Sequence, residues 1–193
     1  MTIGIISYGA GNVASVQNAL DRLGVKSLIS DDRKVLEGCD KLIFPGVGHA
    51  AHAMENLSRK GLDKLLQDFN RPVLGICLGM QLMGSESEEG PTKGLGLIDF
   101  RVKRFEINEK VPQMGWNSIE KIDHPLLGGI ESGSHFYFVH GYYAELSKET
   151  IASSQYEIPF SVAVASGNYF GVQFHPEKSG DAGAKLLKNF INL

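Results

Sequence analysis

The first eighty residues alternate continuous apolar runs with segments in which apolar residues recur every three or four positions. Apolar runs occupy residues 2–7, 25–30, 41–45 and 72–76. The helical spacing occupies residues 13–23, 49–58 and 62–69. A strand that is apolar along its whole length must be covered on both faces, as in a parallel sheet between layers of helices. This alternation predicts an α/β fold with a central, mostly parallel sheet and helices on both of its faces.

The pattern changes after about residue 90. Short strand candidates joined by Gly, Asn and Pro turns follow, at residues 95–105, 111–119, 135–144, 161–165 and 169–174. A last amphipathic helix is expected over residues 180–191. We therefore expect an antiparallel or mixed extension in the C-terminal half, and residues 1–193 as a single domain.

Composition excludes several classes of protein. The net charge of −3 gives no basic footprint for nucleic acid, and no apolar run approaches the roughly 18 residues that span a bilayer. The first residues lack the charged segment that precedes the apolar stretch of a signal peptide. With only two cysteines, Cys39 and Cys77, nothing indicates a disulfide scaffold, so we expect a cytoplasmic protein.

Cys77 stands between glycines at the point where an apolar strand turns into a helix. The pattern Gly75-Ile76-Cys77-Leu78-Gly79 is that of a nucleophile elbow, with sulfur in place of a serine hydroxyl. Flanking glycines permit the strained turn and the close approach of neighbouring backbone. The start of a helix favours a thiolate, and the next N–H, that of Leu78, would face a developing oxyanion. The alternative is an inert buried cysteine in a glycine-rich turn.

A nucleophile of this kind needs a base and a group that orients the base. Of the six histidines, His175 has the most suggestive surroundings, because Pro176 favours an extended conformation at His175. Residues two apart in an extended segment project to the same side, which would set Glu177 beside the imidazole. The alternative is a surface loop that carries His and Glu by coincidence. Together with the elbow, the pattern predicts a triad of Cys77, His175 and Glu177.

Two glycine-containing loops follow predicted strands near the N-terminus. Residues 45–48 (PGVG) follow the third strand at the carboxyl edge of the sheet, where α/β folds bind ligands, so this loop is expected to supply a second oxyanion donor. Residues 9–12 (GAGN) do not match the GxGxxG pattern of dinucleotide-binding proteins. We therefore reject dinucleotide binding as an interpretation of this loop.

Several sequence blocks resemble the triad (class I) glutamine amidotransferases, which have a flavodoxin-like fold. GICLGMQ around Cys77 and FHPE at 174–177 are characteristic of the family. Within it, the chain is most similar to the glutaminase subunits of imidazole glycerol phosphate synthases. The blocks that carry this similarity are PGVG at 45–48, GICLGMQL at 75–82, SEEG at 87–90, MGWN at 114–117, YFVH at 137–140 and VQFHPEKSG at 172–180.

This resemblance implies hydrolysis of glutamine to glutamate and ammonia, without a cofactor or a metal ion. The ammonia would pass to a (β/α)8 barrel cyclase, the partner in a heterodimer of histidine biosynthesis. It assigns the oxyanion hole to Leu78 and Val47, and glutamine binding to Gln81 and Glu89. Gly46 and Gly48 are also expected in the substrate site. The backbone around His140, Gly141 and Tyr142 would form the other wall of the site. The partner interface would contain Gln113, Met114, Gly115, Trp116, Asn117 and Tyr137.

Five positions depart from the family pattern: Ser7, His49, Ala50, Gln113 and Gly141. None belongs to the triad, but His49 and Gln113 are expected near the oxyanion loop or the partner. A related glutaminase that feeds a different synthase, for example in sugar amidation, therefore stays open as an alternative. A non-catalytic activating subunit has no need of a complete triad, and a cysteine peptidase is not expected to carry Gln81 and Glu89.

Cys39 is interpreted as a packing residue, which predicts that Cys39→Ala leaves the rate of glutamine hydrolysis unchanged. The measurement is glutamate release by the purified variant. A large loss of rate in a protein that remains folded would contradict the interpretation.

Overall fold

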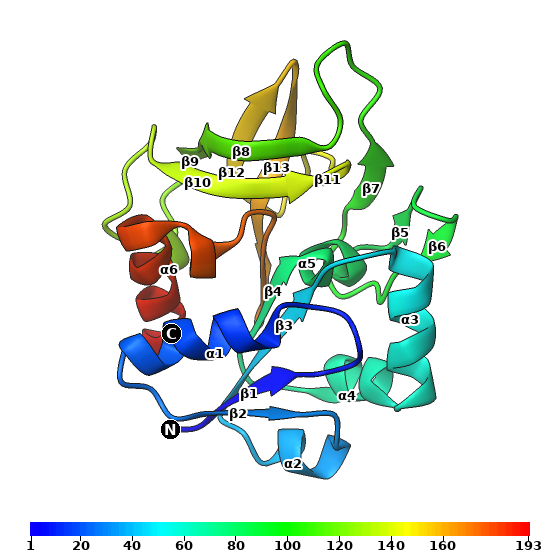
Figure 1. Cartoon of the computed structure of the whole chain (residues 1–193), viewed down its shortest axis with the longest axis vertical. Helices are drawn as coiled ribbons and strands as arrows, with labels where there is room; N and C mark the ends of the chain where they lie inside the picture. The colour runs from blue at the N-terminus through cyan, green and yellow to red at the C-terminus, as the bar shows by residue number, and fades with distance from the viewer.

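A computed structural model describes residues 1–193. Five parallel strands lie at the centre of the fold, below the strand pair at the top of Figure 1, with helices around them. Their spatial order is β2 (Ser27–Ser30), β1 (Ile3–Ile6), β3 (Lys41–Gly46), β4 (Val73–Cys77) and β14 (Tyr169–Val172). Each strand runs parallel to its neighbours in this group. This order is the flavodoxin-like arrangement, in which ligands bind at the carboxyl ends of the strands.

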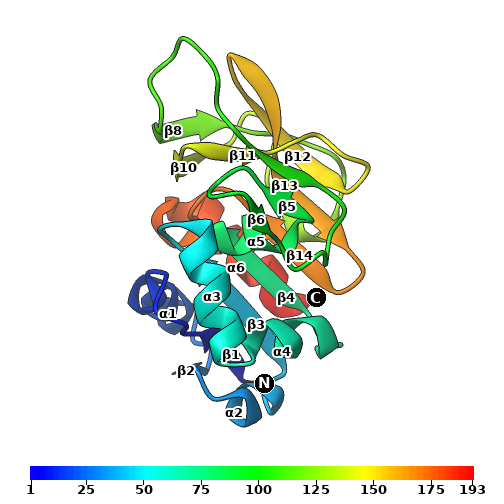
Figure 2. The same ribbon diagram turned by 90° about the vertical axis from the view of Figure 1, so that its right-hand side faces the viewer.

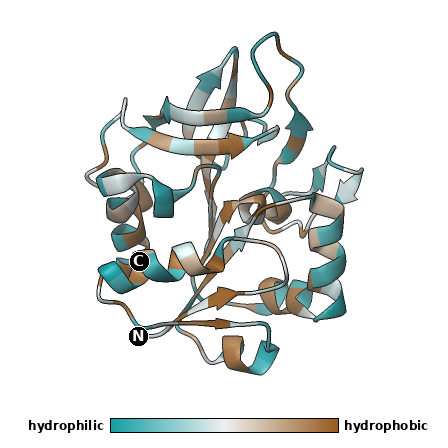
Figure 3. Ribbon diagram, viewed as in Figure 1, coloured by the Kyte–Doolittle hydropathy of each residue, from teal (hydrophilic) through white to brown (hydrophobic).

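Helices cover both faces of this sheet, as the sequence predicts. On one face lie α1 (Val13–Arg22) and α6 (Gly180–Asn192). On the other lie α2 (Arg33–Glu37), α3 (Ala50–Arg59), α4 (Leu62–Asp68) and α5 (Leu78–Met83). Because side chains alternate along a strand, Ile5 and Ile6 belong to two different cores, one under each helical layer. Figure 3 shows the apolar colouring of these strands and the hydrophilic outer surfaces of the helices.

A mixed, mostly antiparallel extension continues the sheet beyond β14, and one strand pair near its far end is parallel. It begins with β13 (Ile158–Ser166), which pairs antiparallel with β14, and then β11 (Tyr142–Ala144) and β7 (Arg101–Arg104). The short strands β5 (Glu86–Ser87) and β6 (Thr92–Lys93) end this path, while β12 (Thr150–Tyr156) joins β13 to β9 (Glu120–Lys121). Figure 2 shows the extension stacked above the parallel part, along the long axis of the molecule.

Two further strands form a separate antiparallel pair across the upper part of Figure 1. These are β8 (Gln113–Ser118) and β10 (His135–His140), with Tyr137 opposite Trp116. The 3-10 turns η1 (Pro125–Leu127) and η2 (Pro176–Lys178) precede β10 and α6 respectively. The pair lies beside the carboxyl ends of β3 and β4, so it bounds the ligand-binding edge of the sheet.

Some elements differ from the sequence-based expectation. The predicted strand over 135–144 is two strands in two sheets, divided at Gly141, and the predicted strand over 95–105 is confined to β7. The helix α2 and the strand β12 were not anticipated. β12 was missed because TIASSQY mixes small and polar residues and lacks strict alternation, although it pairs with β13 along most of its length.

None of the helices combines the length and apolar character that crossing a membrane requires.

The turn from β4 into α5 requires glycine at two positions. A Cβ on Gly79 would overlap the carbonyl oxygen of Phe44 in β3, and one on Gly75 would lie 2.8 Å from the backbone nitrogen of Met80. Neither backbone atom can move without disturbing a central strand or the first turn of α5. The glycines of the GxCxG pattern therefore allow the helix to begin directly against the sheet.

Gly79→Ala is predicted to destabilise the fold by at least about 3 kcal/mol, the upper part of the usual range for overpacking. The backbone at the turn would have to shift, because the new Cβ would overlap Phe44. Urea denaturation measures the change in the free energy of unfolding.

The matched control is Gly38→Ala, at a position of ordinary backbone conformation where the nearest atom to a new Cβ is 3.4 Å away. Equal free energies of unfolding for Gly79→Ala and Gly38→Ala would contradict the requirement for glycine at position 79.

Candidate active site

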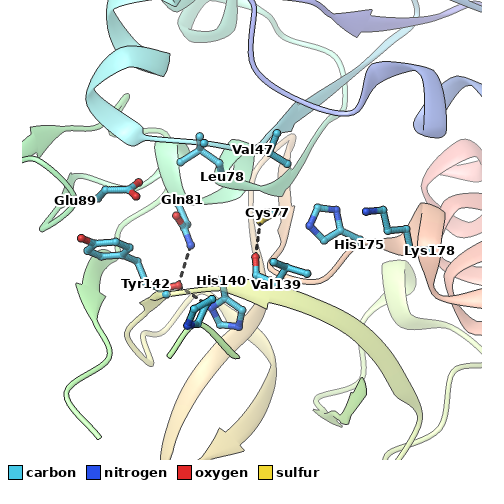
Figure 4. Close-up of a pocket in the computed structure, with 13 residues that line it drawn as sticks. Val47, Cys77, Leu78, Gln81, Glu89, Val139, His140, Tyr142, His175 and Lys178 are labelled. Carbon is cyan, nitrogen blue, oxygen red and sulfur yellow. Dashed lines mark hydrogen bonds between the residues drawn. The ribbon is translucent and has the colours of Figure 1, made fainter. Parts of the chain in front are cut away.

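A cavity of about 290 Å³ opens at the carboxyl ends of β3 and β4 (Figure 4). Its walls come from the loop after β3, the β4–α5 turn, the segment after β5, the end of β10 and η2. The lining residues are Val47, Gly48, Cys77, Leu78, Gln81, Glu89, Pro112, Val139, His140, Gly141, Tyr142, His175 and Lys178. The cavity thus brings together most of the residues that the sequence singles out.

Cys77 occupies the sharp turn that the elbow pattern predicts. Its φ of 54° and ψ of −112° lie outside the regions that non-glycine residues usually adopt, at a cost of about 1–3 kcal/mol. Cys77 is 6% exposed and lines the cavity, and its Sγ lies 3.8 Å from the carbonyl oxygen of Val139. The strained backbone therefore directs a largely buried thiol toward the open space of the site.

His175 and Glu177 form a buried pair beside this thiol. The Nδ1 of His175 lies 2.8 Å from Oε1 of Glu177, and the two side chains are 5% and 2% exposed. Because Nδ1–H donates to the carboxylate, Nε2 is left for the thiol, and Figure 4 shows the imidazole next to Cys77. The predicted triad is thus assembled in space.

The physical reason for this pairing differs from the expected one. His175 is extended, but Glu177 lies within the 3-10 turn η2, so strand-like alternation does not bring the two together. The His175 N–H donates to the carbonyl of Tyr137 in β10 (2.9 Å), and its carbonyl accepts from the hydroxyl of Ser179 (2.6 Å). Anchored at both ends, the short turn folds Glu177 back onto the imidazole.

The surroundings of His175 favour its protonated form. Burial lowers its pKa, but hydrogen bonds and charge interactions with Cys77 and Glu177 outweigh burial and raise the pKa to about 10. The pKa of His175 is therefore higher in the folded protein than in the unfolded chain. For that reason, protonation of His175 contributes its full stabilisation of the fold below about pH 6.5. That contribution is lost as the pH rises toward 10. The arrangement at neutral pH is that of an imidazolium beside a nucleophilic sulfur.

The loop after β3 presents its backbone to the cavity at Val47 and Gly48. Gly48 has a φ of 102°, which favours glycine, and Val47 is exposed. Gly46 does not line the cavity, contrary to its predicted place in the substrate site. It packs against the Tyr8 hydroxyl and the backbone of Gly79, which lie 2.6 and 2.8 Å from the position of a Cβ.

Gln81 and Glu89 lie on the side of Cys77 opposite His175 (Figure 4). The Gln81 Nε2 donates to the carbonyl of Tyr142 and to Oε1 of Gln173, both at 2.9 Å, so its own Oε1 keeps free lone pairs. The Glu89 Oε2 accepts from the N–H of Ala50 in the first turn of α3 (2.8 Å). This end of the cavity is rich in acceptors, as binding of an ammonium group requires.

His140 is buried and neutral at the back of the site. Burial and the charge of His175 lower its pKa to about 4, against a smaller opposing effect of its bond to Tyr142. Neutral His140 therefore stabilises the fold above about pH 6.5, and this contribution is lost as the pH falls through 4. Its Nδ1 lies 2.7 Å from the Tyr142 carbonyl oxygen, which can only accept, so Nδ1 carries the proton.

Gln113 is the hydrogen-bond partner of the other ring nitrogen of His140. The Oε1 position of its amide lies 2.9 Å from Nε2. Because Nε2 of a neutral His140 with a proton on Nδ1 can only accept, we assign the amide in the opposite orientation, with its NH2 group toward Nε2. Gln113 is 4% exposed, which corrects the expectation that its side chain forms part of an interface. It lies in β8 opposite His140, and the inward face of that strand accounts for its burial.

The outward face of β8 and β10 carries exposed apolar side chains near the cavity. Met114 is 66% and Trp116 58% exposed, and the Trp116 ring packs edge-on against Tyr137 at 6.1 Å. The Lys178 ammonium lies 5.8 Å from the centre of the Tyr137 ring, and Lys178 also lines the cavity. Asn117 donates to the carbonyl of Gln155 (3.0 Å), and Gly115 lies between the two exposed side chains.

Four residues at the site were missed from the sequence: Pro112, Val139, Gln173 and Lys178. Only Gln173 carries a signal, because a polar residue interrupts the apolar run from Phe170 to Phe174 next to His175. Pro112, Val139 and Lys178 contribute backbone or border the cavity. Their place at the site depends on tertiary packing alone, so the sequence carries no signal for it. No cluster of three or more His, Cys, Asp or Glu side chains suited to a metal ion occurs in the chain.

Comparisons with known proteins show the family to which the chain belongs. The family model "Glutamine amidotransferase class-I" matches residues 5–193, and the chain belongs to that family. It is 48% identical to the imidazole glycerol phosphate synthase subunit HisH of Bacteroides fragilis, with all of both chains covered. It is 46% identical to the subunit of that name in Vibrio cholerae, over 98% of this chain and 97% of the relative.

Solved structures share the fold at lower sequence identity. One solved glutamine amidotransferase superposes with a TM-score of 0.78 at 21% identity, over 98% of this chain and 97% of that one. The PurLQS structure of Thermotoga maritima gives 0.73 at 19% identity, over 99% and 97%. The predicted α/β architecture is confirmed.

Nuclear magnetic resonance of the six histidines tests the electrostatics of the site. The His175 imidazole is expected to stay protonated from pH 6 to beyond pH 8.5, while His140 stays neutral down to about pH 5. In Cys77→Ala the His175 signal should titrate at lower pH, because one of its two stabilising partners is gone. A His175 signal that is neutral at pH 7 in the unmodified protein would contradict the assignment.

Proposed function

We propose that this protein hydrolyses glutamine to glutamate and ammonia through Cys77, His175 and Glu177, and that it does so as the glutaminase subunit of an imidazole glycerol phosphate synthase. The observation that carries the proposal is the buried His175–Glu177 pair beside the strained Cys77 in one cavity. The full-length similarity to subunits named HisH supports the particular synthase. The proposed location is the cytoplasm, as the sparing use of cysteine indicates.

Cys77 starts the proposed reaction. Its thiolate attacks the side-chain amide carbon of glutamine, and the carbonyl oxygen gains the negative charge. The N–H groups of Leu78 and Val47 are proposed to stabilise this oxyanion, since both residues line the cavity around the sulfur. His175 then protonates the departing nitrogen, which leaves as ammonia, and a thioester remains.

Water completes the cycle. The neutral His175 left after ammonia release removes a proton from water, which attacks the thioester carbon. The sulfur leaves as thiolate, glutamate is released, and His175 is protonated again. Glu177 is not consumed: its carboxylate holds the imidazole in one orientation and stabilises its charge.

The opposite end of the cavity is proposed to bind the amino-acid end of glutamine. The free Oε1 of Gln81 and the carboxylate of Glu89 accept hydrogen bonds from the α-ammonium group. Gly48 and the backbone of His140, Gly141 and Tyr142 form the remaining walls. A substrate held at this end extends its side-chain amide toward Cys77.

The exposed face of β8 and β10 is proposed to bind a (β/α)8 barrel cyclase in a heterodimer. Met114 and Trp116 supply apolar contact area there, with Gly115, Asn117 and Tyr137 around them. Because this face adjoins the cavity that holds Cys77, ammonia can enter the partner without crossing bulk water.

Release of glutamate from glutamine tests the chemistry, with the chain alone and with the cyclase and its nucleotide substrate. We expect stimulation by the loaded cyclase, and a loss on the order of 10³-fold or more in Cys77→Ala. Hydrolysis that depends on Cys77 but is not stimulated by the cyclase would indicate that the ammonia passes to another synthase. No hydrolysis in either condition would contradict the proposed function.

Trp116→Ala tests the docking face. Truncation of a central aromatic residue is expected to weaken cyclase binding about 30-fold, equivalent to about 2 kcal/mol. Calorimetry of the two purified subunits measures the dissociation constant. The control is Ile122→Ala, at a similarly exposed apolar residue on another part of the surface. Equal effects of the two substitutions on the dissociation constant would contradict the placement of the docking face on β8 and β10.

A further inference from the structure

Gln173 is a fully buried amide directly behind the nucleophile. It follows β14, and its own N–H donates to the carbonyl of Val162 (2.8 Å). Its side chain touches two residues of the site: Nε2 lies 3.7 Å from Sγ of Cys77, and Oε1 lies 2.9 Å from Nε2 of Gln81. It does not line the cavity, so it acts only through these neighbours.

The orientation of this amide follows from its partners. Gln81 Nε2 lies 2.9 Å from the Tyr142 carbonyl oxygen, which can only accept, so this end of Gln81 is its NH2 group. The atom of Gln173 that faces the same NH2 group must then be its carbonyl oxygen. The NH2 group of Gln173 is therefore the end that faces sulfur.

Besides His175, two groups contact the sulfur, and they have opposite preferences. The carbonyl oxygen of Val139, at 3.8 Å, accepts a hydrogen bond only from the protonated thiol. The NH2 group of Gln173 donates, and a donor binds the negatively charged sulfur more strongly than the neutral one. A buried donor of this kind shifts the balance toward the thiolate.

We propose that Gln173 is a positioning residue of the active site, whose buried amide holds Cys77 as the thiolate through Nε2 and fixes Gln81 through Oε1. One side chain thereby sets the distance between the nucleophile and the amide that binds substrate. The role of Gln81 in this statement rests on the proposed function, whereas the effect on the thiolate does not.

Other ionisable groups around the sulfur must stay unchanged in a test. His175 faces Cys77 from η2, with Glu177 behind it, and His140 follows Val139 in β10. Tyr8 packs beneath the oxyanion loop, and its pKa is raised by burial and by the charge of Cys77. None of these residues is hydrogen-bonded to Gln173, so changing its amide leaves their contacts in place.

The pH dependence of Cys77 alkylation by iodoacetamide measures the thiolate without any need for turnover. Gln173→Met keeps the length of the side chain but removes the donor and adds no charge. We expect the midpoint of alkylation to rise by about one pH unit, with a roughly tenfold slower rate below the midpoint. Gln173→Glu keeps an acceptor for Gln81 but sets an oxygen against sulfur, and should raise the midpoint further.

Glutamine kinetics separate the two contacts. Gln173→Met also deprives Gln81 of its acceptor, so KM for glutamine should rise together with the fall in kcat. Gln173→Glu keeps that acceptor, and its KM should stay closer to that of the unmodified protein.

Gln67→Glu is the matched control, because its amide lies far from the site and bonds the carbonyl of Leu95. Circular dichroism selects folded variants. An alkylation midpoint in folded Gln173→Met equal to that of the unmodified protein would overturn the proposal. Alkylation that shifts as expected, in a protein that releases no glutamate either alone or with the loaded cyclase, would support the thiolate contact while refuting the proposed function.

Discussion

The contact between α5 and β3 determines the position of Cys77, the proposed nucleophile. Gly79 lies so close to the carbonyl of Phe44 that no side chain fits between them, and α5 therefore begins directly at the sheet edge. The chain can make that turn only if Cys77 adopts a positive φ, which directs its side chain toward the cavity. The surrounding parallel sheet is buried on both faces, and its stability offsets the cost of the strained backbone at Cys77.

A buried set of hydrogen bonds then joins the sulfur to the strand that faces the proposed partner. It runs from Cys77 through Gln173 and Gln81 to the Tyr142 carbonyl, and on through His140 to Gln113 in β8. Each amide orientation is determined by its neighbour, because the carbonyl of Tyr142 can only accept. Since unsatisfied polar groups are costly when buried, this set stabilises one arrangement of the whole site.

The sequence predicted the parallel core and the triad because both leave local signals. Continuous apolar runs mark strands that are covered on both faces, and GxCxG marks a turn with no room for side chains. The burial of Gln113, the turn that carries Glu177 and the contacts of Gln173 left no comparable signal. They depend on how β8, β10 and η2 pack together, which residues distant in sequence decide.

Covalent labelling by a glutamine analogue with an electrophilic group at the amide carbon tests the central claim most directly. Mass spectrometry of the digested protein would locate the adduct. The account predicts one adduct, on Cys77, that excess glutamine prevents and that His175→Asn slows, since the imidazolium beside the sulfur is lost. Labelling of Cys39 instead, or labelling of Cys77 that glutamine does not affect, would contradict it.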